Sequence, residues 1–142
     1  MALSWLDAQQ QIMAPGSGSP FELMEADIRG VKMDVFKNSP PNLAVVLQNA
    51  RNFGDTTFLV YEGEKWSFAR TMDQVDGLCH LMVNTYGIKK GDRVAIAMRN
   101  FPEWIMAFAA IISVGAISVS FNAWWTEDEM DFALQDSGAK LL

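Results

Sequence analysis

Cys79 and His80 are a pair whose residue types could carry out nucleophilic catalysis. A thiol activated by a neighbouring imidazole is a common arrangement of that kind. Adjacent helical positions do not face each other, however, and Cys79 lies on an apolar stripe with Val75 and Met82. We therefore interpret Cys79 as a core residue and His80 as a surface or hydrogen-bonded residue.

Glu127, Asp128, Glu129 and Asp131 are close enough in sequence to suggest a metal site. A calcium loop would also need a glycine at a fixed spacing, whereas Thr126 and Glu129 match a capping box. Carboxylates in the first turn of a helix are stabilised by the helix dipole without a metal. We therefore interpret these residues as the start of a helix.

Arg99, Asn100 and Asn122 follow the ends of two predicted parallel strands. Ligands of open α/β sheets bind in the crevice at that edge, so a contact to substrate or nucleotide is one interpretation. A role in forming the turns is favoured. For Trp124 and Trp125, packing under the loop is favoured over lining an acyl tunnel or an interface.

Residues 1–41 are expected to form an N-terminal arm and linker. A short helix can begin the segment, and a stretch rich in Pro, Gly and Ser follows. The run Gly16-Ser17-Gly18 could be taken for a phosphate loop, but no strand precedes it and no Gly-Lys-Ser/Thr follows. We expect a helical turn or two over residues 21–29 and irregular structure over 31–41.

Local signals predict the elements that come next. Asn42 is a plausible N-cap for a helix that extends to Ala50. A β-rich run over residues 56–61, a turn and a short strand at Trp66 indicate a hairpin. Ser67 can cap a longer amphipathic helix, which a glycine at position 87 would end.

Residues 93–122 form the centre of the chain and allow two interpretations. The 23 residues from 104 to 126 carry no charge, which is enough to span a bilayer core of ~30 Å. The alternative is a strand, a buried helix that begins at Pro102, and a second strand. Because the pattern changes at Gly115 from helical residues to β-branched alternation, a crossover helix feeding a parallel strand is favoured.

Composition limits the remaining possibilities. The 142 residues suffice for one domain with a core, and the net charge of −6 argues against a nucleic-acid-binding protein. Cys79 is the only cysteine, and the N-terminus has no signal-peptide pattern. A reducing compartment, the cytoplasm, is therefore expected.

An ordered set of short blocks resembles the N-terminal part of the adenylate-forming superfamily, over about residues 42–142. The final block, FNAWWTEDEMDFALQDSGAKLL, is most similar to fatty-acyl-CoA ligases. The blocks are Lys90-Gly91-Asp92-Arg93-Val94-Ala95-Ile96, Asn100 with Pro102-Glu103, Gly115-Ala116, Asn122-Ala123-Trp124-Trp125-Thr126 and Asp136-Ser137-Gly138-Ala139-Lys140.

The resemblance implies an α/β fold: a partial doubly wound, mostly parallel sheet, with an N-terminal helix and a β-hairpin. Residues 42–142 would be an incomplete N-terminal subdomain, cut at the start of a strand, and the 93–122 stretch would lie inside it rather than in a membrane. The implied reaction joins a carboxylate such as a fatty acid to CoA through an acyl-adenylate, with ATP and Mg²⁺ as cofactors.

The catalytic signatures that this resemblance would bring are missing from the sequence. No Ser/Thr/Gly-rich loop with a following lysine is present, so no catalytic, cofactor-binding or metal-binding residue is carried over. We expect an inactive fragment that binds no cofactor alone. The alternatives are a non-enzymatic domain that self-associates into a homo-oligomer through an open sheet edge and, less favoured, a single-span membrane protein.

Overall fold

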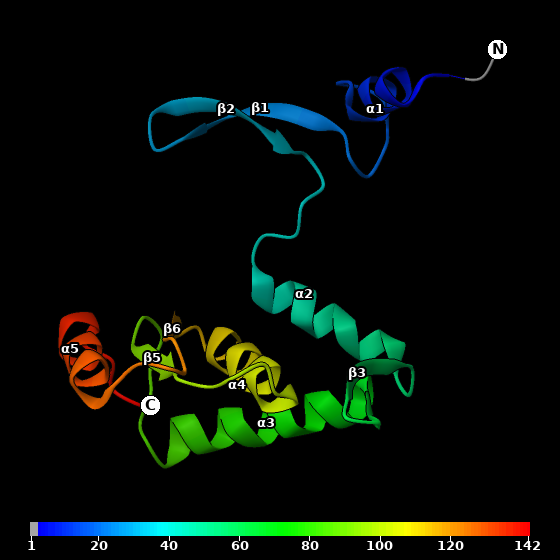
Figure 1. The fold of residues 1–142 in the computed structure, drawn as a ribbon. Coiled ribbons are helices and arrows are strands. Elements are labelled where there is room, and N and C mark those ends of the chain that lie inside the picture. Colours follow the sequence, from blue (N-terminus) through cyan, green and yellow to red (C-terminus); the bar gives the residue numbers. More distant parts are fainter. Residues whose placement is uncertain (1–2) are drawn as a thin grey trace. The chain divides into compact units, whose positions relative to one another are not determined.

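The computed structural model describes residues 3–142, and contacts between residues divide the chain into two units, Met1–Pro41 and Asn42–Leu142 (Figure 1). Each unit is described by itself. The first contains a helix and a two-stranded sheet, and the second contains the remaining helices and two further two-stranded sheets.

The first unit begins with helix α1 (Trp5–Met13), which Ser4 caps by accepting a hydrogen bond from the Asp7 N–H. Strands β1 (Leu23–Ile28) and β2 (Val31–Phe36) then form an antiparallel hairpin. The expected helical turn over 21–29 and irregular structure over 31–41 are therefore wrong. The chain forms a hairpin here because Arg29 and Gly30 make a two-residue turn between the strands. Both residues have positive φ, 56° and 84°, as the turns that join antiparallel strands require.

The two faces of this hairpin differ in character. Residues directly opposite each other in an antiparallel pair lie on the same face, and three such pairs place six apolar side chains together. The exposed fractions of four of them lie between 43% and 57%. The six residues, named here the hairpin face, are Met24, Ala26, Ile28, Val31, Met33 and Val35.

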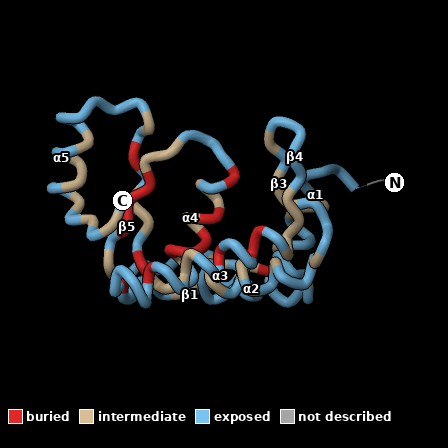
Figure 2. The backbone as a smooth tube through the Cα atoms, turned by 90° about the horizontal axis from the view of Figure 1, so that it is seen from below, coloured by how far each residue is buried: buried red, intermediate tan, exposed pale blue. Residues whose placement is uncertain are grey.

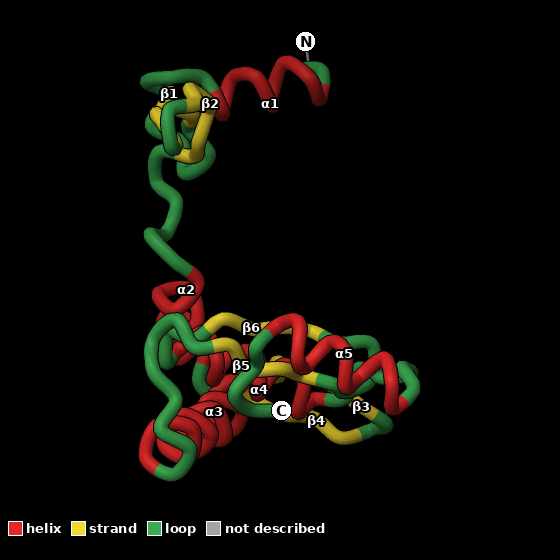
Figure 3. The backbone as a smooth tube through the Cα atoms, turned by 90° about the vertical axis from the view of Figure 1, so that its left-hand side faces the viewer, coloured by secondary structure: helices red, strands yellow, loops and turns green. Residues whose placement is uncertain are grey.

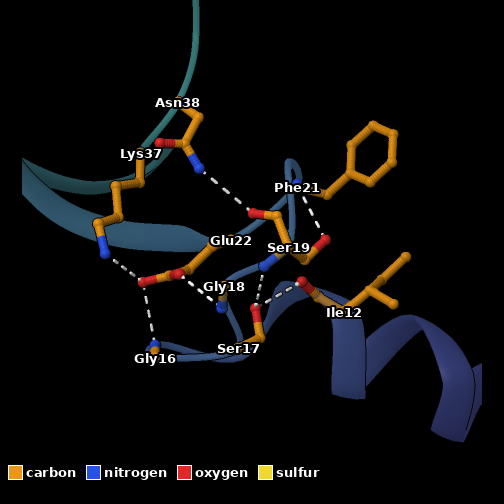
Figure 4. A network of polar contacts seen from close by, with 9 residues as sticks. All are labelled: Ile12, Gly16, Ser17, Gly18, Ser19, Phe21, Glu22, Lys37 and Asn38. Carbon is orange, nitrogen blue, oxygen red and sulfur yellow. Dashed lines mark hydrogen bonds and ion pairs between the residues drawn. The ribbon is translucent and has the colours of Figure 1, made fainter.

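Glu22 joins the loop after α1 to the hairpin (Figure 4). Its carboxylate accepts hydrogen bonds from the N–H groups of Gly16 and Gly18, both at 3.0 Å, and from the Lys37 ammonium at 2.7 Å. These three donors lower the pKa of Glu22 to about 2, with Lys37 the largest contributor. The Gly-Ser-Gly run thus holds a carboxylate of its own chain and is an ordered loop rather than a flexible linker.

The second unit opens with helix α2 (Leu43–Ala50) and a short 3-10 helix, η1 (Arg51–Phe53). Asn42 caps α2 as predicted, since its side chain accepts the Val45 N–H at 3.0 Å. Strands β3 (Thr57–Tyr61) and β4 (Glu64–Ser67) form the predicted hairpin, and Ser67 caps the long helix α3 (Phe68–Asn84).

A small parallel sheet follows α3. Strand β5 (Arg93–Ile96) pairs with β6 (Ile117–Ser120), and helix α4 (Pro102–Ser113) makes the crossover between them (Figure 3). On the other side of β5, Leu141 forms a parallel bridge with Val94. The expected strand–helix–strand centre and the start of a further parallel strand are therefore both present.

The core of this unit lies where α3, α4 and β5 meet (Figure 2). Met72 and Val75 of α3 and Ile111 of α4 are each 1% exposed. The prediction that the helix beginning at Pro102 is buried is only half correct. One face, with Met106 and Ala109, is buried in this core, whereas side chains such as Trp104 on other faces are only partly covered.

The last helix, α5 (Glu127–Ser137), has the predicted capping box, and Gly138 ends it with a φ of 63°. No residue of α5 is buried. Among the residues that the structure describes, no helix has both the length and the apolar character needed to cross a membrane.

Candidate functional site

A hollow of about 500 Å³ opens at the carboxyl ends of β5 and β6. The two strands run parallel and in register, so the loops that follow them emerge at the same edge. A hydrogen bond of 2.9 Å from the Phe121 N–H to the Ile96 carbonyl continues the pairing to that edge. The lining residues are Tyr61, Met98, Arg99, Asn100, Phe101, Trp104, Phe121, Asn122, Ala123 and Trp124.

Arg99 supplies a positive charge to this hollow. Its guanidinium carbon lies 4.7 Å from the centroid of the Trp124 ring, a contact worth about 0.5–1 kcal/mol at an exposed site. The structure gives Arg99 no ion pair with any residue between 3 and 142. Its charge can therefore act on an anionic ligand.

Trp124 and Trp125 do not share one environment. The side chain of Trp124 is 73% exposed, so the expectation that it packs under the loop is wrong. Trp125 lies against Phe121, with ring centroids 5.5 Å apart, and is 38% exposed. The turn before Trp124 is fixed by a hydrogen bond of 3.0 Å, in which the Trp124 backbone N–H donates to the side-chain oxygen of Asn122.

Both strand-end loops use their polar residues to fix the backbone. The Asn122 carbonyl also accepts the Trp125 N–H at 3.2 Å, and the Arg99 carbonyl accepts the Phe101 N–H at 2.7 Å. The favoured turn-forming role thus describes the Asn122 side chain and the Arg99 backbone. The Arg99 side chain is directed to Trp124 instead, and Asn100 lies on the lining of the same hollow.

One residue of the β3–β4 hairpin, Tyr61, also lines the hollow. Tyr61 meets Phe101 edge to face, with ring centroids 5.5 Å apart and an interplanar angle of 83°. Loss of hydration raises the pKa of the Tyr61 hydroxyl, and a hydrogen bond with Glu62 raises it further. Tyr61 therefore stays protonated at neutral pH, and the hollow is suited to bind an anion beside a planar or apolar group.

Sequence reasoning missed Tyr61 and Phe101 as lining residues. Tyr61 reaches the hollow through a contact between parts of the chain that are distant in sequence, and nothing local to residues 57–61 indicates it. Phe101 could have been found from its position, because it lies between the loop residue Asn100 and the N-terminal turn of α4.

Several of the short sequence blocks position the chain around β5 and do not line the hollow. Asp92 forms an ion pair of 2.7 Å with Lys140 and accepts the Lys89 N–H at 2.9 Å. These two donors, Lys140 first, lower the pKa of Asp92. At Gly115, φ is +77° and an added Cβ would lie 3.1 Å from Cγ of Lys90.

The other residues considered for chemistry are separate from the hollow. Cys79 is half-buried, its thiol donates to the Ala110 carbonyl at 3.6 Å, and burial raises its pKa, while His80 is exposed on α3. The Glu129 carboxylate accepts a hydrogen bond from the Thr126 N–H at 2.8 Å, and this bond lowers the pKa of Glu129.

The residues present do not fit a magnesium site. Within residues 3–142, no three His, Cys, Asp or Glu side chains are grouped to hold a metal ion. The lining of the hollow contains no carboxylate, although Mg²⁺ is bound in proteins chiefly by carboxylates and phosphates. No step of a reaction is therefore assigned to a metal on this chain.

A sequence profile of the family described as AMP-binding enzyme matches residues 46–142, which include all of the secondary structure from β3 onwards. The chain belongs to this family. The likeness to adenylate-forming enzymes drawn from the short blocks is thereby confirmed.

Two curated relatives of the chain are CoA ligases. The chain is 35% identical to oxalate–CoA ligase of Arabidopsis thaliana over 102 residues, covering 70% of this chain and 20% of that enzyme. It is 34% identical to crotonobetaine/carnitine–CoA ligase of Salmonella paratyphi A over 98 residues, covering 66% of this chain and 19% of that enzyme. The chain thus spans about a fifth of the length of these relatives.

Two solved structures share the fold. The N-terminal subdomain of Klebsiella oxytoca NpsA in complex with 3-hydroxyanthranilyl-AMSN superposes with a TM-score of 0.64 at 24% identity, covering 69% of this chain and 25% of that one. O-succinylbenzoate coenzyme A synthetase of Bacillus subtilis, in complex with ATP and a magnesium ion, superposes with a TM-score of 0.61 at 26% identity. The match covers 66% of this chain and 26% of that one. The predicted fold, the incomplete α/β domain of an adenylate-forming enzyme, is confirmed.

Proposed function

We propose that this chain is the N-terminal part of an ATP-dependent acid–CoA ligase. In the first half-reaction a carboxylate oxygen attacks the α-phosphorus of ATP, forming an acyl-adenylate and releasing pyrophosphate. In the second, the thiol of CoA attacks the acyl carbon and AMP leaves. The family membership and the two CoA-ligase relatives support this reaction class.

Within that ligase, we assign the hollow at the carboxyl ends of β5 and β6 to contact with a bound substrate. The observation that carries this assignment is the Arg99 guanidinium without an ion-pair partner among the described residues, set over the exposed Trp124 ring. Carboxylate and phosphate are the groups that a guanidinium binds best. A fatty acid or other carboxylate, ATP and CoA all carry one or the other.

The role of Arg99 can be tested in the longer ligase polypeptide that contains this chain. Arg99→Ala is expected to lower kcat/KM at least 10-fold, because the charge facing the substrate is lost. Arg70→Ala is a matched control, since Arg70 also stacks on a tryptophan, with its guanidinium carbon 3.6 Å from the Trp66 ring centroid. Equal losses in the two variants would count against the assignment.

By itself, the 142-residue chain is proposed to be inactive and to bind no cofactor. The sequence lacks the phosphate-binding loop with its lysine, and the hollow has no carboxylate for a metal-bound phosphate. Incubation with ATP, Mg²⁺, CoA and a panel of carboxylates should release no pyrophosphate above the buffer value. Release that follows the chain through purification at constant specific activity would overturn the proposal.

The size of the protein in its source cells tests the wider proposal directly. An antibody raised against residues 42–142 should detect a polypeptide several times longer than this chain, in the cytoplasmic fraction. Detection of only a 15.8 kDa species would favour an independent role for the chain.

That independent role, a non-enzymatic domain that forms a homo-oligomer, is favoured by one observation. The hairpin face exposes four large apolar side chains on a sheet of only two strands, and such a sheet is marginally stable in water unless another element covers it. Sedimentation at rising concentration distinguishes the two roles: a monomer throughout would remove the support for self-association.

A further inference from the structure

The loop that follows β6 starts from a fixed point at the edge of the parallel sheet. The Phe121 N–H donates to the Ile96 carbonyl at 2.9 Å, and the Phe121 side chain is buried, at 8% exposure. Pairing between the strands therefore fixes the chain up to Phe121. Residues 122–126, which lead from there to α5, lie outside every helix and strand. Their backbone has to be held by bonds of another kind.

Asn122 supplies two of these bonds. Its side-chain oxygen accepts the Trp124 N–H at 3.0 Å, and its backbone carbonyl accepts the Trp125 N–H at 3.2 Å. An asparagine side chain that bonds to the backbone two residues ahead forms an Asx-turn, which fixes the main chain where no regular element does so. The direction of the Trp124 Cα–Cβ bond therefore depends on the side chain of Asn122.

The Trp124 ring in turn lies under the side chain of Arg99. The guanidinium carbon is 4.7 Å from the ring centroid, inside the ~6 Å over which an aromatic ring attracts a cation. Between residues 3 and 142 this guanidinium forms no ion pair. The bond from the Phe101 N–H to the Arg99 carbonyl fixes only the main chain. The ring of Trp124 is therefore the contact that can hold the charge of Arg99 in one place.

We propose that Asn122 is a positioning residue for the substrate contact of Arg99. The turn at Asn122 fixes the backbone of Trp124, the Trp124 ring holds the guanidinium, and the guanidinium binds a carboxylate or phosphate of the substrate. The inference rests on the proposed function, since it takes the hollow as a place of substrate contact. The contacts that support it all join residues of this chain, so none of them requires a surface that stays uncovered in a longer polypeptide.

The first test is NMR of the 142-residue chain, because an aromatic ring shifts the signals of protons that lie over it. In W124A the side-chain signals of Arg99 should take the values of a free arginine. N122A should move them at least half of the way to those values. In N122S the hydroxyl forms a weaker turn of the same kind, so this variant should move them less than N122A.

Asn42→Ala is the matched control for both tests. The side chain of Asn42 also accepts a backbone N–H at 3.0 Å, at the start of α2, so the same type of bond is lost at another place. This variant should leave the Arg99 signals unchanged. Circular dichroism of each variant confirms that the helices are kept.

The second test measures turnover by the longer ligase polypeptide that contains this chain. R99A and N122A should raise the KM of the same substrate, whether that is the carboxylate, ATP or CoA, because both weaken one anion contact. N122A should lower kcat/KM at least threefold but less than R99A does, N122S should restore part of the loss, and N42A should change it less than twofold. The double variant N122A/R99A should lose less than twofold relative to R99A, because the two residues act through one contact.

The outcomes separate this inference from the proposed function. Unchanged kinetics in R99A would overturn both, since no substrate would then meet the guanidinium. A loss in R99A that N122A multiplies in the double variant would overturn the positioning role and leave the substrate contact in place. The positioning role would also be overturned by Arg99 signals that stay unchanged in N122A, by an increase in the KM of a different substrate, or by equal effects of N122A and N42A.

Discussion

The two units of this chain achieve local order by different means. In residues 42–142, side chains such as Met72, Val75 and Ile111 are almost fully removed from water, and burial of apolar surface is the main stabilising term. Among residues 3–41, the described part of the first unit, Glu22 is the only buried residue, at 4% exposure. Its carboxylate accepts hydrogen bonds from Gly16, Gly18 and Lys37, whereas the other unit is held together by buried apolar side chains. The loop after α1 is therefore tied to the hairpin by one carboxylate with three donors rather than by buried apolar side chains.

The largest effect is expected from a cavity in the apolar core. Ile111→Ala should lower the free energy of unfolding of residues 42–142 by about 3 kcal/mol, because a fully buried side chain loses its contacts. Urea titration followed by tryptophan fluorescence measures this loss. Ile28 lies on the hairpin face of the first unit, where its side chain is 44% exposed. Ile28→Ala should change the free energy of unfolding of the first unit by less than about 0.5 kcal/mol. Similar losses would mean that burial does not distinguish the two units.

A smaller effect in the same unit is expected from the backbone. Gly115→Ala should cost about 1–2 kcal/mol, because its φ of +77° is strained for alanine and the new Cβ would crowd Lys90. Gly77→Ala is the matched control, since Gly77 lies inside α3 with no atom within 4 Å of an added Cβ. It should stabilise the unit by about 0.5–1 kcal/mol. Loss of stability in the control would show that α3 does not tolerate alanine.

In the first unit, Glu22→Gln should release the loop of residues 14–22 and leave the second unit unchanged. The amide can still accept a hydrogen bond, but it cannot hold the Lys37 ammonium and two N–H groups equally well. Limited proteolysis should cut this loop at least 10-fold faster in the variant. Glu25→Gln is the control, because Glu25 pairs with Lys32 at 3.0 Å on the exposed surface. Unchanged cleavage in Glu22→Gln would contradict the role given to Glu22.

The smallest effect is a pH dependence confined to the first unit. Folding lowers the pKa of Glu22 from 4.5 to about 2, so its stabilising contribution is complete above about pH 4.5 and is lost as the pH falls towards 2. Hydrogen exchange at Gly16 and Gly18 should therefore speed up over this range relative to unstructured amides. The same profile in Glu22→Gln should be flat, and an identical slope in both proteins would assign the change to another group.

Much of the second unit could be predicted because its signals are local. The side chains of Asn42, Ser67 and Thr126 each cap a helix by bonding to a backbone N–H three residues ahead, within the same short segment. The parallel strands around α4 could also be predicted, because the change of pattern at Gly115 falls where the crossover ends.

The hairpin of the first unit was mispredicted, unlike the short helix before it, because its order depends on pairing between segments. Met24, Glu25 and Ala26 have ordinary helical propensity, yet they form a strand because β2 lies beside them in register. The order of the loop at Gly16 and Gly18 also depends on a later segment. Their backbone N–H groups donate to Glu22, and the Glu22 carboxylate is held in turn by Lys37. Of the residues that line the hollow, Arg99, Asn100 and Asn122 could be predicted because they follow strand ends, whereas Tyr61 could not.

The ion pair between Lys140 and Asp92 joins residues 48 positions apart, and it has a consequence for the order of events on the ribosome. Strand β5 is synthesised early, but its neighbour on one side, Leu141, is among the last residues of this sequence to be made. Until then, that side of β5 stays unpaired and its apolar residues stay accessible to chaperones. Nascent chains stalled before Lys140 should therefore be digested within β5 more readily than the released protein.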